Sequence, residues 1–164
     1  RFPIEPFRTL GAYVIRNGIR RKERAEDNNL APSKLDNYLA KLDKKISEWE
    51  SKMSKLNQKE IIFFHSAWIY FADRFGIKIA GYVEPKPGIP PTPSHNADII
   101  QLIKKKNIKL IVMDVFYSDS APKQIASVTG AKVLKIPTQV YGLKNITSYI
   151  ELIDNMINQI SSNG

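Results

Sequence analysis

The segment Glu60-Ile61-Ile62-Phe63-Phe64-His65, a short apolar run that ends in a side chain capable of chemistry, decides the fold. From this point the chain repeats one unit, in which an apolar run is followed by a polar-to-helical segment. The later apolar runs lie at residues 77–83, 110–113 and 133–136. Strands that alternate with helices predict an α/β fold with a four-stranded parallel sheet flanked by helices.

The residues that follow the four predicted strands are candidates for one functional site. Each strand leads to a side chain that can bind or react, and in chain order these are His65, Glu84, Asp114 and Gln139. The carboxyl ends of parallel strands lie at one edge of a sheet, and ligands bind outside that edge. We therefore expect the four side chains to lie along one edge, although they are far apart in the sequence.

The connections between the strands carry helix signals. We expect helices over residues 66–75, from Ser94 to Lys106, up to Thr129-Gly130, and over 146–160. The stretch 85–93 contains five prolines, which favour a rigid, extended connection.

Two helical segments are predicted before the first strand. Residues 6–26 carry apolar side chains near helical spacing, and Pro32 to Leu56 carry a continuous apolar stripe at spacings of three and four. A coiled coil produces the same stripe, but a long helix lying along a globular domain fits equally well. We predict two parts: a helical segment over 1–58 that includes a long N-terminal backbone helix, and a β/α lobe over 59–164.

Composition limits the class of protein. The chain of 164 residues suits about one domain, and it contains no cysteine, which excludes disulfides and thiolate metal sites. The sequence has no apolar stretch long enough to span a membrane. It begins at Arg1 without a starting methionine or a recognisable targeting segment, so we interpret it as a processed or truncated product. The absence of cysteine suits an extracytoplasmic protein.

The chain is basic, with 25 lysines and arginines against 16 acids and a net charge of +9. Such a balance can indicate binding to nucleic acid or to an anionic membrane surface. The densest clusters, residues 16–24 and 104–106, have no interleaved aromatic residues of the kind that stack on single strands. We interpret them as solvated faces and expect no nucleic-acid partner.

Three segments together resemble a known family. They are residues 64–76, with a histidine, an aromatic helix and a Phe-Gly exit; the proline-rich turn at 85–95; and the strand entry at 129–133. The chain resembles, over essentially its whole length, the zinc/manganese-type (cluster A-I) substrate-binding proteins of bacterial metal ABC transporters. The first two segments together make the resemblance fairly specific.

The resemblance implies a fold and a function. Members of the family have two β/α lobes joined by a long helix, with a divalent metal ion held in the cleft between the lobes. On this match the chain is the linking helix and the C-terminal lobe. It is expected to capture Zn²⁺, or alternatively Mn²⁺, and to deliver the ion to an ABC permease in the membrane. The expected location is periplasmic or extracytoplasmic, with a lipoprotein anchor in the full-length form as a further possibility.

Only some of the family's metal-ligand positions match a suitable ligand residue in this chain. His65 occupies the place of a ligand in this lobe, whereas Arg1 falls at or near the place of the preceding ligand histidine. Gln139 aligns with the family's carboxylate ligand, and a neutral amide is a poor substitute for a carboxylate. Asp114 matches an acidic strand-end residue that we expect to orient other groups. His65 is thus the best metal candidate, Asp114 and Gln139 are weaker ones, and this chain alone is not expected to complete the family's site.

Other interpretations of these residues remain open. A histidine that caps the next helix would look like His65, and an exposed His95 is a less favoured metal ligand. Hydrolysis with His65 as base would need a nucleophile, but the sequence lacks a Gly-x-Ser-x-Gly elbow and a Gly-rich phosphate loop, so we expect no enzyme. An adhesin-like or protein-interaction relative that has lost tight metal binding is the main alternative, with self-association through the helix 32–56.

Overall fold

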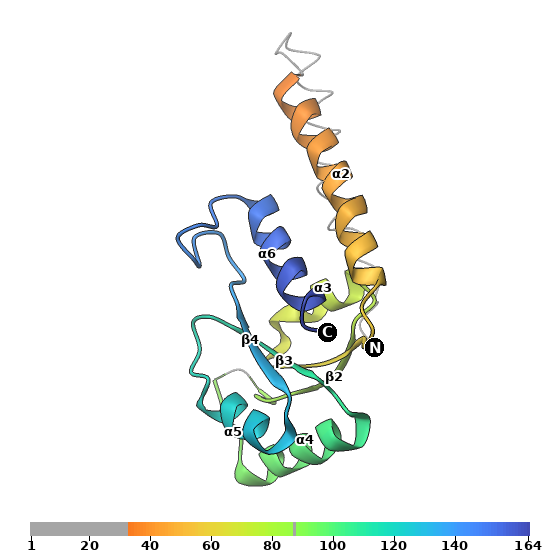
Figure 1. The fold of residues 1–164 in the computed structure, drawn as a ribbon. Coiled ribbons are helices and arrows are strands. Elements are labelled where there is room, and N and C mark those ends of the chain that lie inside the picture. Colours follow the sequence, from red (N-terminus) through yellow and green to blue (C-terminus); the bar gives the residue numbers. More distant parts are fainter. Residues whose placement is uncertain (1–32, 87) are drawn as a thin grey trace, which may run out of the picture. The chain divides into compact units, whose positions relative to one another are not determined.

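The computed structural model describes residues 33–86 and 88–164 (Figure 1). The expected helix 6–26 and Arg1 lie outside these residues. The elements in chain order are α2 (Ser33–Ser54), β1 (Glu60–Phe63), the 3₁₀ turn η1 (Ser66–Trp68), α3 (Ile69–Arg74), β2 (Lys78–Tyr82), α4 (Pro93–Lys106), β3 (Leu110–Asp114), α5 (Ser120–Thr129), β4 (Lys132–Ile136) and α6 (Tyr149–Ser161). None of the described helices has the length and apolar run needed to cross a bilayer.

The four strands form one sheet in the order β2-β1-β3-β4, and all neighbouring pairs are parallel. The predicted α/β fold with a four-stranded parallel sheet is therefore confirmed. The connection from β2 to β3 runs through α4 and passes over β1, so that the first strand lies inside the sheet. All four strands consequently end at the same edge, which we call the carboxyl edge.

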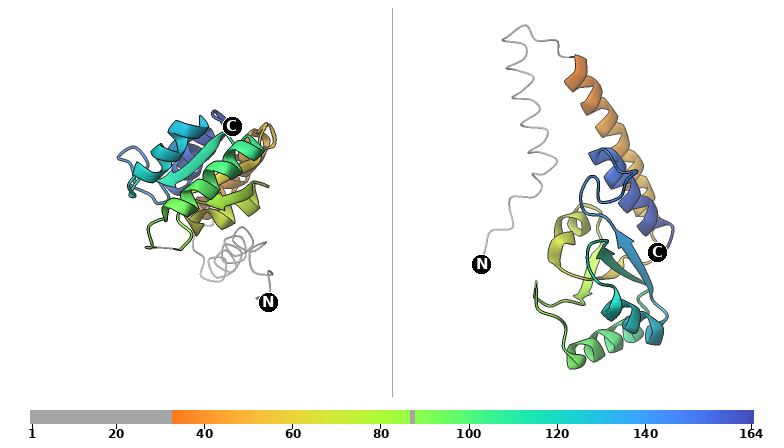
Figure 2. Two further views of the ribbon diagram at one scale, coloured as in Figure 1. Left: turned by 90° about the horizontal axis from the view of Figure 1, so that it is seen from below. Right: turned by 90° about the vertical axis from the view of Figure 1, so that its left-hand side faces the viewer.

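Helices cover both faces of the sheet. In Figures 1 and 2, α4 and α5 lie on one face while α3 and α6 lie on the other. Ile62 and Met113 belong to the buried cluster that includes Ile103 of α4 and Ile125 of α5. On the other side, Trp68 stacks on Phe63 with ring centroids 5.6 Å apart, and both side chains are almost fully buried. Alternate residues of one strand thus serve two cores.

The first turn of α4 differs from the prediction. Thr92, and not Ser94, occupies the N-cap position, and its Oγ1 accepts a hydrogen bond from the backbone N–H of His95 at 3.2 Å. Pro93 takes the first helical position, where its missing N–H costs nothing. The prediction therefore placed the cap two residues too late, because a proline was treated as outside the helix.

The last helix, α6, begins with a capping box. Ser148 Oγ accepts from the backbone N–H of Glu151, and a carboxylate oxygen of Glu151 accepts from the backbone N–H of Ser148. The same carboxylate accepts from the backbone N–H and the hydroxyl of Thr147 at 2.7 and 2.8 Å. This reciprocal arrangement fixes the start of α6 three residues after the predicted position.

The hydrogen bonds from Thr147 lower the pKa of the Glu151 carboxyl below its ordinary value of 4.5. Because this pKa is lower in the folded chain than in the unfolded chain, the group stabilises the fold above pH 4.5 and loses that contribution as the pH falls through the folded pKa. We expect an NMR titration of the Glu151 carboxyl to give a midpoint below 4.5. In a Thr147→Val variant the midpoint should move up towards that value, and an unchanged midpoint would contradict the assignment.

The chain divides into two compact units, Arg1–Ser47 and Glu48–Gly164. In the first unit the structure describes only the beginning of α2, where Leu42 is buried. In the second unit the last turns of α2 pack on α6, because Trp49 Nε1 donates to Asp154 Oδ1 at 2.7 Å and Trp49 and Met53 are buried. This end of the apolar stripe is therefore already covered. The proposed boundary at residue 58 and self-association through the earlier part of the helix stay predictions.

Candidate functional site

Three polar or charged side chains are buried among the residues that the structure describes, and each follows a strand at the carboxyl edge. His65 comes after β1, Glu84 after β2, and Asp114 ends β3; their exposed fractions are 8%, 8% and 2%. Burial of such groups is costly unless they are paired or functional. The parallel sheet thus brings three of the four strand-end residues to one edge in a buried state.

His65 lies between β1 and the turn η1 in an extended conformation, and its side chain makes no capping hydrogen bond. The helix-capping interpretation therefore gains no support. Its ring meets the ring of Tyr117 edge-on, with centroids 4.5 Å apart and an interplanar angle of 89°. Its Nδ1 atom is buried and has no hydrogen-bond partner. Packing therefore holds the imidazole in place, and Nδ1 is not committed to another protein group.

Glu84 fixes the start of the proline-rich connection. Its Oε1 accepts a hydrogen bond from the backbone N–H of Gly88 at 2.7 Å, and Lys86 and Ile89 form a bridge within the same turn. The other oxygen, Oε2, is buried and has no partner. Glu84 therefore anchors the start of this loop through one carboxylate oxygen and leaves the other unpaired.

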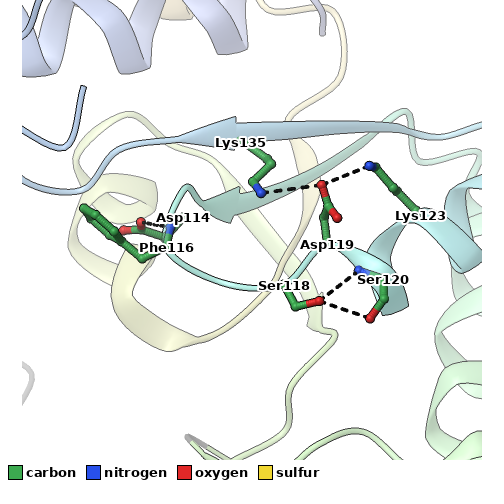
Figure 3. A network of polar contacts seen from close by, with 7 residues as sticks. All are labelled: Asp114, Phe116, Ser118, Asp119, Ser120, Lys123 and Lys135. Carbon is green, nitrogen blue, oxygen red and sulfur yellow. Dashed lines mark hydrogen bonds and ion pairs between the residues drawn. The ribbon is translucent and has the colours of Figure 1, made fainter. Parts of the chain in front are cut away.

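Asp114 ties the end of β3 to the segment after β4. Its Oδ1 accepts from the backbone N–H of Phe116 at 3.0 Å (Figure 3), and its Oδ2 accepts from the hydroxyl of Thr138. Both carboxylate oxygens are therefore engaged within the protein. The arrangement suits a residue that orients the two loops better than one that binds a metal ion directly.

Gln139 is exposed, unlike the other three strand-end residues. Its backbone carbonyl accepts from the N–H of Gly142 at 3.1 Å within a tight turn. At Gly142 a Cβ atom would lie 2.7 Å from Cβ of Pro137, so only glycine fits without a shift of the turn. The Gln139 side chain therefore lies at the rim of the carboxyl edge, three residues beyond the end of β4.

Asp119 occupies the N-cap position of α5 but makes no side-chain capping bond. Its Oδ2 instead lies 3.1 Å from Lys123 Nζ and 3.5 Å from Lys135 Nζ (Figure 3). The hydrogen bond from Lys123, and then the positive charge of both lysines, hold the pKa of Asp119 below its ordinary value. Two neighbouring cations already satisfy this carboxylate, so a metal ion has little to gain there.

A cavity of about 440 Å³ opens beside Glu84. Its polar lining includes Glu84, Asn96, Ser118 and Gln124, and Tyr117 separates it from the His65 ring by direct ring contact. The Oδ1 atom of Asn96 is also buried without a partner. The cavity and the imidazole thus share one aromatic wall at the carboxyl edge.

His95 is half-buried, whereas the sequence suggested an exposed side chain. Its Nε2 lies 2.9 Å from the backbone carbonyl oxygen of Tyr82, to which it donates. Within residues 33–86 and 88–164, no group of three or more histidine, cysteine, aspartate or glutamate side chains could hold a metal ion. The described part of the chain therefore does not by itself form a three-ligand site of these side chains around His65.

Tyr117 was missed by sequence reasoning. It is the third residue after β3, and its ring packs against Phe64 as well as His65, with centroids 5.6 and 4.5 Å apart. The sequence does show a tyrosine just beyond a strand end, but its contact with His65 depends on β3 lying beside β1. That order is not readable from one sequence, so the contact with His65 was not predicted.

Comparison with known proteins adds to this geometry. The model of the family described as "Zinc-uptake complex component A periplasmic" matches residues 14–163. The "High-affinity zinc uptake system protein ZnuA" of Bacillus subtilis (strain 168) is 26% identical over 125 residues, which are 76% of this chain and 37% of that protein. The chain therefore spans well under half the length of this relative.

Solved structures share the fold. A crystal structure of ZnuA superposes with a TM-score of 0.70 at 21% identity, covering 89% of this chain and 53% of the other. The laminin-binding protein Lmb of Streptococcus agalactiae, described as bifunctional with adhesin and metal-transporting activity, gives a TM-score of 0.64 at 24% identity and covers 87% and 57%. At these identities the likeness supports the fold alone, over about half of each neighbour.

Proposed function

The chain belongs to the family of periplasmic component A proteins of zinc-uptake complexes, and from this premise we propose that it captures a divalent transition metal ion for an ABC importer. The metal is the cargo, and the chain acts by binding and release without catalysis. The observation that carries the proposal is the buried His65 at the carboxyl edge, whose Nδ1 has no hydrogen-bond partner among the residues that the structure describes. Imidazole is the commonest metal-binding side chain.

We assign the three candidate residues different parts. His65 binds the ion. Asp114 holds the loops after β3 and β4 through Phe116 and Thr138, which keeps the rim of the site in place. Gln139 lies exposed at that rim and contributes at most a neutral oxygen, a weak ligand for a transition metal.

The remaining ligands come from a second lobe. The chain covers 53% of the solved ZnuA chain, which leaves room for a lobe of similar size in the whole protein. Two lobes that close on the ion would complete a four-ligand site and exclude water from it. Release would then follow when the protein meets its permease at the membrane, outside the cytoplasm and with or without a lipid anchor.

Zinc is the preferred ion in this proposal, with manganese as the alternative. Affinity for nitrogen ligands rises from Mn²⁺ towards Zn²⁺ in the usual order of divalent metals. Carboxylate and carbonyl oxygens would shift the preference towards manganese. The carboxyl edge offers one uncommitted imidazole, while the oxygens of Asp114 are already engaged, so this lobe favours zinc.

The proposal is tested by NMR titration of the chain, because its only two histidines, His65 and His95, give separate ring signals. We expect Zn²⁺ to perturb the His65 signals at a lower concentration than those of His95, whose Nε2 already donates to a carbonyl. Mn²⁺ should broaden the His65 signals at higher concentrations, and Mg²⁺ should leave them unchanged. Equal perturbation of both histidines would contradict a specific role for His65.

A second candidate function is protein binding by an adhesin-like relative. Exposed aromatic side chains gather in the segments after β3 and β4, where Phe116 is 58% and Tyr141 is 72% exposed. Such side chains are typical of interfaces. In the titration above, absence of any zinc effect on His65 would favour this candidate over metal transport.

A further inference from the structure

The edge of the sheet opposite the carboxyl edge is lined by lysines. A lysine lies at the start of each of the four strands: Lys59 precedes β1, Lys78 begins β2, Lys109 precedes β3, and Lys132 begins β4. All four side chains are exposed. Because the strand order is β2-β1-β3-β4, they form a row across the sheet at one lysine per strand.

Lysines at the ends of neighbouring segments widen this row into a surface. The last turn of α4 carries three consecutive lysines at its C-terminus, and one more lies between α2 and β1. We call the whole set the lysine edge, and its members are Lys55, Lys59, Lys78, Lys104, Lys105, Lys106, Lys109 and Lys132. It spans the sheet and the helix layer on one face, so it is broad as well as long.

The backbone holds these lysines in register. The N–H of Lys78 donates to the carbonyl of Lys59, and the N–H of Lys132 donates to the carbonyl of Lys109, both at 2.7 Å. Gln58 joins the two pairs, because its Oε1 accepts from the Lys109 N–H at 3.0 Å. With strands about 4.8 Å apart, the row is about 14 Å long. These hydrogen bonds therefore fix the backbone positions from which the charged side chains extend.

Few acids offset this charge. Glu60 lies 2.8 Å from Lys78 Nζ and 3.0 Å from Lys106 Nζ, so one carboxylate serves two lysines. Asp73, in the last turn of α3, is followed at once by Arg74, which itself pairs with Glu50. The lysine edge thus keeps a large positive excess, and like charges at such spacing favour an anionic partner.

The chemical nature of the charged groups indicates which class of partner this edge binds. The neighbouring Arg74 is paired with Glu50, and the other cations of the edge are lysines. Lysine is a compact, hydrated point charge that suits diffuse attraction, whereas arginine suits bidentate recognition. Base stacking has no platform here, since the exposed aromatic residues of the second unit all follow carboxyl ends of strands: Tyr70, Phe116, Tyr117, Tyr141 and Tyr149. A broad, flat partner with many separate negative charges fits these features better than a nucleic acid.

We propose that the lysine edge binds the surface of an anionic lipid bilayer. The contact is electrostatic and reversible, with the ammonium groups close to lipid phosphates and no chain inserted into the hydrocarbon. Binding through this edge leaves the carboxyl edge facing the solution, so His65 stays accessible to its ion. This membrane contact goes beyond the proposed metal capture and does not depend on it.

The test measures binding of the chain to sedimented vesicles of phosphatidylcholine with and without phosphatidylglycerol. We expect binding to the anionic vesicles only, with loss as the ionic strength rises to about 0.15 M and above, where the screening length falls to about 8 Å. A variant with Lys59, Lys78, Lys109 and Lys132 changed to glutamine should bind about fivefold more weakly per lysine, and so a few hundredfold more weakly in all.

A matched control separates the lysine edge from net charge. Changing Lys34, Lys41, Lys44 and Lys144 to glutamine removes the same number of charges from exposed positions outside the lysine edge, and should weaken binding by less than about fivefold. Circular dichroism checks that both variants fold. Equal loss in the two variants, binding to neutral vesicles, or binding of soluble polyphosphate without binding of anionic vesicles would each overturn the proposal.

Discussion

Changing His65 to alanine in the whole protein, with both lobes present, is expected to weaken its zinc binding by about 100-fold or more. The reason is that no second imidazole lies ready to take over at the carboxyl edge, since His95 already donates its Nε2 hydrogen to the Tyr82 carbonyl. Loss of a group that only supports a ligand costs about 10- to 100-fold in affinity, and loss of the ligand itself should cost at least the upper part of that range. Isothermal titration calorimetry measures the difference.

The matched control is His95→Ala, which removes the other histidine of the chain. It breaks the contact with Tyr82 but should change zinc affinity by less than about threefold. An Asp114→Asn variant adds information, because it should disturb the turn at Phe116 without removing a direct ligand. If His65→Ala and His95→Ala weaken zinc binding equally, His65 is not the specific ligand proposed here.

Changing Trp68 to alanine should lower the free energy of unfolding by about 3–5 kcal/mol, as truncation of a large buried aromatic side chain does. Trp68 is 1% exposed, stacks on Phe63 and meets the edge of Phe71 at 5.7 Å. Its truncation would leave a cavity beside Phe63 at the end of β1, close to His65. Urea unfolding followed by circular dichroism gives the value.

Two further variants show whether packing is the cause. The indole Nε1 of Trp68 is buried without a partner, so Trp68→Phe removes an unpaired donor and should cost less than about 2 kcal/mol. Phe116→Ala truncates an aromatic side chain that is 58% exposed, and should cost less than about 1 kcal/mol. If Trp68→Ala costs no more than Phe116→Ala, Trp68 is not part of a tightly packed core.

The sheet could be predicted because its signal is local. Ile61 to Phe64 and Leu110 to Met113 are uninterrupted apolar runs, as strands buried on both faces require, and the structure places both at the centre of the sheet. The starts of helices were less predictable. The cap depends on one side-chain hydrogen bond at Thr92 and on a reciprocal pair at Ser148, and several nearby residues could have made such bonds.

The candidate site was predictable only as a set of strand ends. Burial of His65, Glu84 and Asp114 follows from their positions after buried strands, whereas exposure of Gln139 follows from the turn at Gly142 that carries it to the rim. The contact of His65 with Tyr117 depends on β1 lying beside β3, a choice of topology that periodicity does not encode. Contacts that depend on which strands are neighbours therefore could not be predicted from the single sequence.

The lysine edge makes the distribution of charge over the lobe uneven. Buried carboxylates lie at one end, in Glu84 and Asp114, and the lysines lie at the other. A cation diffusing towards the molecule is repelled most strongly by the lysine edge, so the net charge of +9 opposes its approach less on the side of the carboxyl edge. Salt screens this repulsion, so the rate of ion capture should rise with ionic strength.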